Sequence, residues 1–420
     1  MTNHTFILII SGNEILSGRR QDKHISYLTN AMTQLGITCL RCIVVGDEVG
    51  SFEAAVRSAL MDANLVITTG GLGPTTDDLT RDAISNATGI PLQENADALQ
   101  MIADRFARIN RVMKDNNRLQ ALVPISGCFL PNDNGTAPGL VFEKDEKTVI
   151  ALPGPPRELE PVFQQQVIPY LDKRIPNRVI PISKTFHFCG IGESNVDEAM
   201  RRHFHDEPGL NISYLAGLGI VELRLSIHDD SQPAHTRLEE YSQKVHRLFP
   251  EVIFSATYDT LEETVIHLLL DKKQTVSVAE SCTGGMLGEK LTSVAGSSSV
   301  FKGGVIAYSN EIKQFVLGVH DDTLEIYGAV SRETAFEMAL EIVNEFQTDW
   351  GISITGIAGP GGGTDEKPVG TVWIAVANQN GEVYPFLAKS AGDRDSIRQR
   401  SCYYALDQLR RLLLGYKVHE

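Results

Sequence analysis

The stretch Leu65-Val66-Ile67-Thr68-Thr69-Gly70-Gly71-Leu72-Gly73-Pro74-Thr75-Thr76-Asp77-Asp78 decides the fold of the first part of the chain. It starts as a short apolar run typical of a buried strand, continues as a glycine-rich loop, and leads into a helical segment. Residues 5–10 and 37–45 are predicted to be earlier strands, with helices ending at Gly36 and covering residues 51–63. Strands that alternate with helices form parallel sheets, so we expect an α/β fold with a site at the strands' carboxyl ends.

The rest of the chain divides into two further segments. Pro169, Pro176 and Pro181 interrupt the pattern near Leu171, after which apolar and polar residues alternate over residues 221–228, as in an exposed antiparallel strand. From residue 256 strands and helices alternate again. We therefore predict three domains, at residues 1–170, 171–255 and 256–420: an α/β domain, a small α+β domain and a second α/β domain.

Composition excludes several classes of function. The 38 Lys and Arg residues against 53 Asp and Glu residues leave a net charge of −15, so nucleic acid is not an expected partner. No apolar run approaches the ~18 residues that span a membrane, and neither a membrane partner nor a secretory signal is expected. Six cysteines in 420 residues are too few for a disulfide framework, which favours a reduced, cytoplasmic protein.

Cys39 and Cys42 form a single CxxC sequence within the predicted strand 37–45. Residues three apart on a regular strand point to opposite faces. We therefore expect two separate thiols, with redox or metal chemistry as the less favoured alternative.

The loop after residue 69 has the residue types of an anion site. Glycines let backbone N–H groups crowd around a phosphate, and threonine hydroxyls can donate to it. The candidate phosphate-binding residues are Gly70, Gly71, Gly73, Thr75 and Thr76. Asp77 and Asp78 repel a bare phosphate but can bind a divalent cation that bridges to a diphosphate, and the alternative is that they cap the next helix.

Ser281 follows a second predicted buried strand, at residues 275–279, and precedes a helix. A helix start stabilises an alkoxide and the oxyanion formed after nucleophilic attack. A serine needs a base, and Lys313 can serve if burial keeps its amine neutral, with Tyr308 relaying or orienting the proton. Locally, a capping Ser281 and a solvated Lys313 are the simpler interpretations, and Cys282 is a rival nucleophile.

Further polar and glycine positions surround that segment. We expect backbone N–H groups near Thr283 to Gly285 to bind the oxyanion. Arg394 can bind a phosphate with its planar fork, unless it pairs with Asp393 or Asp395. The candidate substrate-binding residues here are Thr283, Gly284, Gly285, Thr355, Gly356, Gly359 and Arg394.

The carboxyl-terminal segment resembles the CinA family (competence/damage-inducible protein A). The resemblance is carried, in order, by residues 279–285 (AESCTGG), 295–298 (AGSS), 308–311 (YSNE), 328–331 (GAVS), 353–360 (SITGIAGP) and 367–372 (KPVGTV). It implies an amidohydrolase that deamidates nicotinamide mononucleotide without a cofactor. Similar enzymes are thought to use a serine and a lysine, which correspond here to Ser281 and Lys313, with Tyr308 assisting.

The first segment resembles the molybdopterin-binding (MoaB/MogA-like) three-layer fold as it occurs in this family. The matching blocks are residues 70–78, 135–139 (GTAPG) and 152–156 (LPGPP). The resemblance implies ADP-ribose pyrophosphatase activity that needs a divalent cation, with Asp77 and Asp78 as its ligands. One block departs from the common pattern G-T-E-L-L-x-G followed by D-T-N, because this chain has Asn13 in the first motif and Asp22-Lys23-His24 in place of the second.

The middle segment resembles the KH-like module of the same family. Taken together, these resemblances imply a bifunctional pyridine-nucleotide salvage hydrolase whose partners are small nucleotides, and a homodimer is the default expectation. The alternative is a competence-associated or molybdopterin-binding protein whose amino-terminal domain has no turnover.

Overall fold

The computed structural model describes residues 4–419 and divides into two compact units. The first contains residues up to Pro181 together with residues 228–230, and the second contains the remainder. Within residues 4–419, no helix combines the length and the apolar character needed to cross a membrane.

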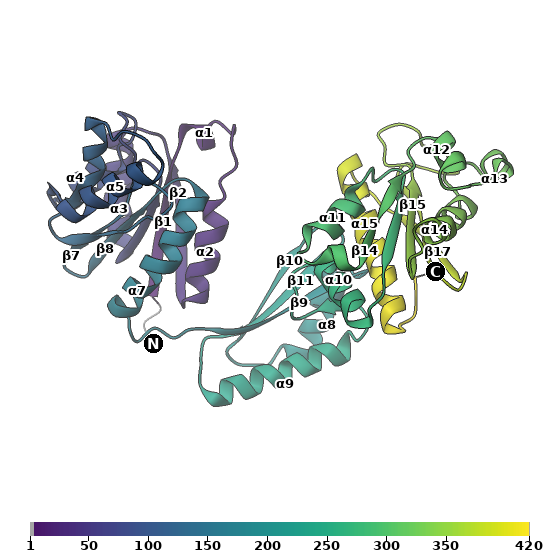
Figure 1. Cartoon of the computed structure of the whole chain (residues 1–420). Helices are drawn as coiled ribbons and strands as arrows, with labels where there is room; N and C mark the ends of the chain where they lie inside the picture. The colour runs from purple at the N-terminus through teal and green to yellow at the C-terminus, as the bar shows by residue number, and fades with distance from the viewer. Residues whose placement is uncertain (1–3, 420) are drawn as a thin grey trace. The chain divides into compact units, whose positions relative to one another are not determined.

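The first unit is built on a six-stranded mixed sheet in the order β2-β1-β3-β8-β7-β6 (Figure 1). Strands β2, β1, β3 and β8 are parallel, whereas β7 and β6 run antiparallel to the strands beside them. Ile7 and Ile9 of β1 face a core formed with α3, α4 and α5, while Phe6 and Leu8 face a second core formed with α2, α6 and α7. This is the three-layer MogA-like α/β arrangement that the sequence predicts.

The elements of this unit follow one another along the chain as β1 (His4–Ser11), α1 (Asn13–Leu16), α2 (His24–Gln34), β2 (Ile37–Val45), α3 (Val49–Asp62), β3 (Leu65–Thr69), α4 (Thr80–Thr88), β4 (Leu92–Glu94), α5 (Ala96–Arg108), the 3₁₀ helix Asp115–Ala121, β5 (Leu122–Pro124), β6 (Gly127–Leu130), β7 (Gly139–Lys144), β8 (Lys147–Leu152), α6 (Pro156–Val162), the π-helical turn Phe163–Val167 and α7 (Ile168–Arg174). Strands β4 and β5 form a separate two-stranded ribbon.

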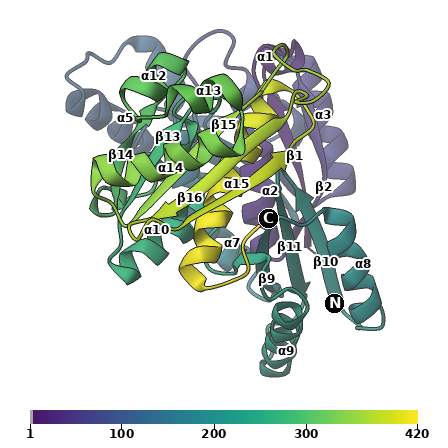
Figure 2. The same ribbon diagram turned by 90° about the vertical axis from the view of Figure 1, so that its right-hand side faces the viewer.

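The second unit begins with a KH-like α+β domain. Its antiparallel sheet has the order β10-β11-β9-β12, and helices α8 and α9 pack with it around one core (Figure 2). Residues of β11 alternate between half-buried and buried, which is the alternation that the sequence shows. The elements are β9 (Ile182–Cys189), α8 (Glu193–Phe204), β10 (Leu210–Ala216), β11 (Ile220–Ile227), α9 (Gln232–Leu248) and β12 (Ile253–Ser255).

The carboxyl-terminal α/β domain has a five-stranded sheet in the order β14-β13-β15-β16-β17. Strands β14, β13 and β15 are parallel, and β16 and β17 are antiparallel to their neighbours. Helices α10, α11 and α15 cover one face and α14 the other. The elements are α10 (Leu261–Lys272), β13 (Val276–Glu280), α11 (Met286–Ser293), the 3₁₀ turn Ser297–Ser299, β14 (Phe301–Ile306), α12 (Asn310–Phe315), α13 (Asp321–Ile326), α14 (Arg332–Phe346), β15 (Trp350–Gly356), β16 (Thr371–Asn378), β17 (Val383–Lys389) and α15 (Arg394–Leu414).

The last helix joins the two domains of this unit. Near its carboxyl end the buried Asp407 carboxylate pairs with Arg410 and Arg411, each at 2.7–2.8 Å. Arg410 also donates to the carbonyl oxygen of Glu251 at 2.6 Å, just before β12. A buried charge costs free energy unless it is paired and hydrogen-bonded, and this cluster meets that condition while linking α15 to the KH-like domain.

Two local predictions differ from the structure, each for a structural reason. The helix predicted over residues 51–63 starts earlier, at Val49, with Glu48 at its N-cap. Strand β17 is a further element that the sequence analysis did not identify. Cys39 and Cys42 do not lie on opposite faces of β2, because a β-bulge shifts the register between them and brings their sulfur atoms to 3.7 Å.

Candidate active site

Ser281 lies directly after β13, at the carboxyl edge of the carboxyl-terminal sheet. Its N–H donates to the carbonyl oxygen of Ile354 on β15 at 2.9 Å, and its side chain is 7% exposed. Residues 282–285 form a turn, and α11 begins only at Met286. Ser281 is therefore not the cap of that helix, which removes the simpler local interpretation of this serine.

The Lys313 amine meets the Ser281 hydroxyl. Helix α12 is capped by the Ser309 hydroxyl, and it directs Lys313 inward until Nζ lies 3.0 Å from Ser281 Oγ and 2.8 Å from the carbonyl oxygen of Ala307. Lys313 is 1% exposed and takes part in no ion pair within residues 4–419. It is therefore not the solvated helix lysine of the simpler local interpretation.

Burial changes the proton affinity of this amine. Removal from water disfavours the ammonium and lowers the pKa of Lys313 below its ordinary value, and the electrostatic effect of Cys282 opposes this without reversing it. A neutral amine can donate one hydrogen to the Ala307 carbonyl and accept the Ser281 hydroxyl proton with its lone pair. The pair thus has the geometry of a nucleophile and its base.

Cys282 is the less suitable nucleophile. It belongs to the apolar core between the sheet and α10, α11 and α15, and burial raises the pKa of its thiol to about 11. Because the thiolate is the nucleophilic form of cysteine, a buried thiol with a raised pKa is unreactive near neutral pH.

Glu280 organises the turn after Ser281 in a way that the sequence analysis missed. Its carboxylate is 1% exposed and accepts the N–H groups of Gly285, Leu287 and Gly288 at 2.8–3.0 Å. It therefore occupies the amino end of α11, where a negative charge is favoured by the helix dipole. The signal available in the sequence was an acidic residue between a buried strand and a glycine-rich turn.

This carboxylate revises the expected oxyanion site. Gly285 donates to Glu280 and Gly284 donates to the Ser281 carbonyl at 3.1 Å, so neither N–H is free, contrary to the expectation for Thr283 to Gly285. Among the described residues, the Cys282 and Thr283 N–H groups have no hydrogen-bond acceptor. These two amides, which follow Ser281 directly in the sequence, are therefore the candidate oxyanion donors of this turn.

Tyr308 and Arg394 form a second group at the rim. Arg394 donates to the Tyr308 hydroxyl at 3.1 Å and to the carbonyl oxygen of Gly359 at 2.7 Å. Asp393 caps α15 and Asp395 pairs with Arg398, so neither is the partner of Arg394. Tyr308 is 63% exposed, and its hydroxyl accepts this hydrogen bond from Arg394, so the two side chains lie together at the surface.

The remaining contacts of this domain hold the loops near Tyr308 and Arg394 in place. The Thr355 hydroxyl donates to the Ala329 carbonyl at 2.6 Å, and Arg398 donates to the Thr283 carbonyl at 2.7 Å. Gly356 lies so close to Val372 that an added Cβ would approach it to 2.6 Å. Thr355 and Gly356 therefore fix the loop positions, and Arg398 is a supporting residue that the sequence analysis did not identify.

The amino-terminal domain has its own cleft, of about 380 Å³, at the carboxyl ends of β1 and β3. Gly70, Gly71, Asp77 and Asp78 line it, together with the loop at residues 10–24, whereas Gly73, Thr75 and Thr76 are not among its lining residues. Lys23 and His24, where the sequence departs from the family pattern, both line the cleft.

The two aspartates of this cleft differ in their contacts. Asp78 accepts the N–H and the hydroxyl of Thr75, at 2.9 and 2.5 Å, so it closes its own loop and does not cap α4. Asp77 is exposed, and hydrogen bonding by Thr75 lowers the pKa of its carboxyl. Residues 4–419 hold no cluster of three or more metal-ligating side chains. Asp77 is therefore the carboxylate of the two that is open to solvent, and Mg²⁺ sites in proteins commonly use one or two carboxylates plus substrate phosphates and water.

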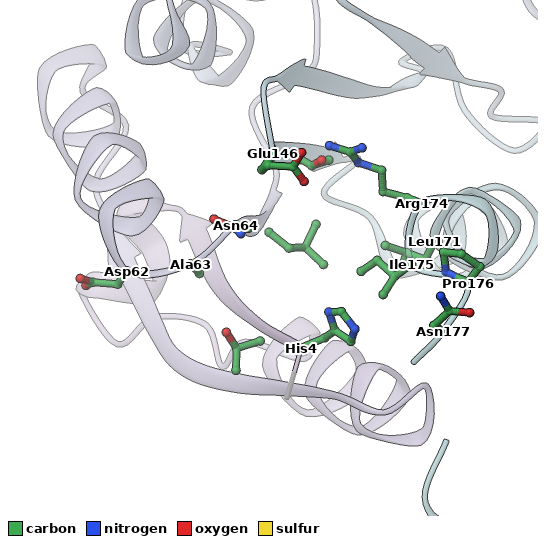
Figure 3. Close-up of a pocket in the computed structure, with 13 residues that line it drawn as sticks. His4, Asp62, Ala63, Asn64, Glu146, Leu171, Arg174, Ile175, Pro176 and Asn177 are labelled. Carbon is green, nitrogen blue, oxygen red and sulfur yellow. The ribbon is translucent and has the colours of Figure 1, made fainter. Parts of the chain in front are cut away.

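A larger cavity, of about 610 Å³, lies at the opposite edge of the same sheet, where β1, β3 and β8 begin (Figure 3). Its floor is apolar, with Leu171 and Ile175, and Glu146 and Arg174 stand at its rim. None of the described residues that line it belongs to the predicted sites.

Comparison with known proteins gives the family. Residues 258–413 match the "CinA C-terminal domain", residues 7–173 the "Probable molybdopterin binding domain" and residues 183–255 the "Damage-inducible protein CinA KH domain". A CinA-like protein of Gloeothece citriformis is 42% identical over 411 residues, which cover 97% of this chain and 98% of that protein. The chain belongs to the CinA family.

Other CinA proteins match at similar levels. A CinA-like protein of Crocosphaera subtropica is 41% identical over 412 residues, covering 97% of this chain and 99% of that protein. Among solved structures, the competence/damage inducible protein CihA of Agrobacterium tumefaciens is 38% identical, with a TM-score of 0.35, and covers 37% of this chain and 97% of that one. The protein CinA of Thermoplasma acidophilum is 35% identical, with a TM-score of 0.36, and covers 40% and 97%.

The Glu280 contacts predict a stability effect in this CinA-family chain. Glu280→Gln removes the charge and one acceptor oxygen from three buried N–H groups, and should lower the free energy of unfolding of the carboxyl-terminal domain by about 1–3 kcal/mol. Urea denaturation of the full chain measures this, with the exposed Glu289→Gln on α11 as the matched control, expected within about 0.5 kcal/mol of wild type. Equal midpoints for both variants would show that the carboxylate does not secure the turn.

Proposed function

We propose that the carboxyl-terminal domain is an amidohydrolase that converts nicotinamide mononucleotide and water to nicotinate mononucleotide and ammonia. The observation that carries this proposal is the 3.0 Å approach of a buried lysine amine, with a lowered pKa, to the Ser281 hydroxyl. Membership in the CinA family supports the choice of reaction, because the Ser–Lys arrangement is the one that the family resemblance implies.

The proposed reaction has two halves. Neutral Lys313 takes the proton from Ser281 Oγ as that oxygen attacks the carboxamide carbon, and the Cys282 and Thr283 N–H groups stabilise the oxyanion. Lys313 then gives its proton to the amide nitrogen, the C–N bond breaks and ammonia leaves. In the second half Lys313 takes a proton from water as the water oxygen attacks the acyl carbon. The bond between that carbon and Ser281 Oγ then breaks, Lys313 returns the proton to Ser281, and nicotinate mononucleotide leaves.

Substrate binding is assigned to the rim. Arg394 is held by the Gly359 carbonyl and the Tyr308 hydroxyl, and we propose that its guanidinium binds the substrate's ribose phosphate. Tyr308 is thus a positioning residue for Arg394 and not the primary base. No metal is required for this reaction.

We propose that the amino-terminal cleft hydrolyses ADP-ribose to AMP and ribose 5-phosphate with a divalent cation. Asp77 would hold the cation, Asp78 shapes the loop, and the Gly70 and Gly71 region would receive the diphosphate. The bound cation would neutralise charge on the diphosphate. The match to a molybdopterin-binding domain family supports binding of a phosphate-bearing ligand in this cleft, and co-purified molybdopterin would instead favour the competing binding function.

Removal of the nucleophile gives the first test of the amidase. Ser281→Ala should lower ammonia release from nicotinamide mononucleotide at least about 10³-fold without unfolding the protein. Ammonia is measured in a coupled assay, and exposed Ser298→Ala, on the neighbouring 3₁₀ turn, serves as the control with unchanged activity. Retained activity in Ser281→Ala together with loss in Cys282→Ala would assign the nucleophile to the thiol.

The protonation state of Lys313 predicts the pH profile. The base must be uncharged, so kcat/KM should rise as the pH rises through the pKa of Lys313. Because burial lowers that pKa, this rise should occur at a pH below the ordinary lysine value of 10.5. Lys313→Arg, whose guanidinium stays protonated, should lose about 10²–10⁴-fold at all pH values. Lys302→Arg on the exposed side of β14 is the control. An unchanged limb in Lys313→Arg would exclude this lysine as the base.

The cation site is tested at Asp77. Asp77→Asn should raise the Mg²⁺ concentration needed for half-maximal AMP formation from ADP-ribose at least about tenfold. Ammonia release from nicotinamide mononucleotide should not change, and chelator should abolish only AMP formation. Exposed Asp82→Asn, in the first turn of α4, is the matched control. The same Mg²⁺ dependence in wild type and Asp77→Asn would rule out this ligand.

A further inference from the structure

Two thiols on the edge strand β2 lie in contact. The Sγ atoms of Cys39 and Cys42 are 3.7 Å apart, although the residues are three positions apart on one strand. Both cysteines are free, and β2 forms the outer edge of the six-stranded sheet. Neither residue belongs to the cleft or to the amidase site.

A β-bulge produces this contact. Cys39 pairs with Phe6 of β1, and the next register pair is Arg41 with Ile7, so Leu40 has no counterpart. The extra residue reverses the alternation, and Cys42 pairs with Leu8. Because Phe6 and Leu8 point into the same core, Cys39 and Cys42 share one face of β2.

The pair differs from the other thiols of the chain. Cys189, Cys282 and Cys402 are buried, and Cys128 is an exposed residue of a different strand, β6. Within the pair, Cys42 is exposed and Cys39 is half-buried. Burial, together with the neighbouring Cys42 thiol, raises the pKa of Cys39 to about 12. Reaction from solvent should therefore start at Cys42.

We propose that Cys39 and Cys42 are a redox-active dithiol that closes to a disulfide by exchange with a small-molecule disulfide of the glutathione class. The sulfur atoms must move from 3.7 Å to the bond length of about 2.05 Å. The bulged edge strand pairs with a neighbour on one side only, which leaves it freer to adjust than a central strand.

The exchange is balanced in two steps. The Cys42 thiolate attacks one sulfur of oxidised glutathione, the S–S bond breaks, and one glutathione thiolate leaves and takes up a proton. The Cys39 thiolate then attacks Cys42 Sγ in the mixed disulfide and expels the second glutathione. The protein loses two electrons and two protons, and oxidised glutathione becomes two thiols.

The site lies on the strand that leads to the amino-terminal cleft. Strand β2 ends at Val45, and Asp47, two residues later, accepts the N–H of Asn13 at 3.0 Å and lines the cleft. The pair therefore lies on the strand that leads into the segment containing Asp47, although no residue of β2 itself lines the cleft. The proposal itself concerns the dithiol and does not depend on the activity of the cleft.

Trypsin provides a direct readout, because Arg41 separates the two cysteines. Cleavage after Lys23, Arg41 and Arg57 places Cys39 in the peptide 24–41 and Cys42 in the peptide 42–57. The full-length protein is equilibrated with oxidised and reduced glutathione, free thiols are alkylated, and the unreduced digest is analysed by mass spectrometry. We expect the two peptides to be linked, with loss of two of the six thiols, and to separate on reduction.

Variants of Cys39 and Cys42 test the order of the two exchange steps. Cys39→Ser should retain a stable glutathione adduct on Cys42, whereas Cys42→Ser should reduce adduct formation on this strand at least about tenfold. Cys128→Ser, which removes an exposed cysteine of β6, should leave the linked peptides unchanged. If a variant does not fold, faster alkylation of Cys42 than of Cys39 in native wild-type protein tests the same order. Separate, fully alkylated peptides from oxidised wild type, or a lasting adduct on its Cys42, would overturn the proposal.

Discussion

The carboxyl-terminal site depends on one contact, the approach of an amine to a hydroxyl where water is excluded. Lysine is a base only when its proton has been lost, and in water that requires an alkaline medium. Here the fold favours loss of that proton by burying Lys313 between α12 and the strand ends, where the amine donates a hydrogen bond to the Ala307 carbonyl. The carbonyl oxygen accepts a hydrogen bond from the amine but carries no net charge. A carboxylate in its place would favour the ammonium and raise the pKa of the lysine.

The turn beside this contact shows how the fold divides its amide groups between structure and chemistry. A helix start presents several unpaired N–H groups, and a nearby anion of any kind competes for them. Glu280 accepts the N–H groups of Gly285, Leu287 and Gly288 and leaves those of Cys282 and Thr283 without an acceptor among the described residues. The buried carboxylate thus satisfies the start of α11, while the amides next to Ser281 in the sequence stay available for the proposed reaction.

The sequence predicts elements whose signals are local. The apolar run at residues 65–69 predicts a strand, which is observed as β3 with the same bounds. What it does not predict depends on neighbours in space. The bulge at Leu40 appears only in the pairing with β1, and Glu280 reads as an ordinary acidic residue until the turn folds over it. The closeness of Ser281 and Lys313 followed from family resemblance, since their separation of 32 positions carries no local signal.

Helix α15 has a mechanical consequence for the KH-like domain. Its 21 residues span about 30 Å and run from Arg394, which contacts Tyr308, to the buried charge cluster that is hydrogen-bonded to the chain just before β12. Arg398, one helical turn after Arg394, donates a hydrogen bond to the Thr283 carbonyl oxygen. The KH-like domain thereby anchors the carboxyl end of α15, and because a helix is a stiff element this anchoring limits the movement of its amino end.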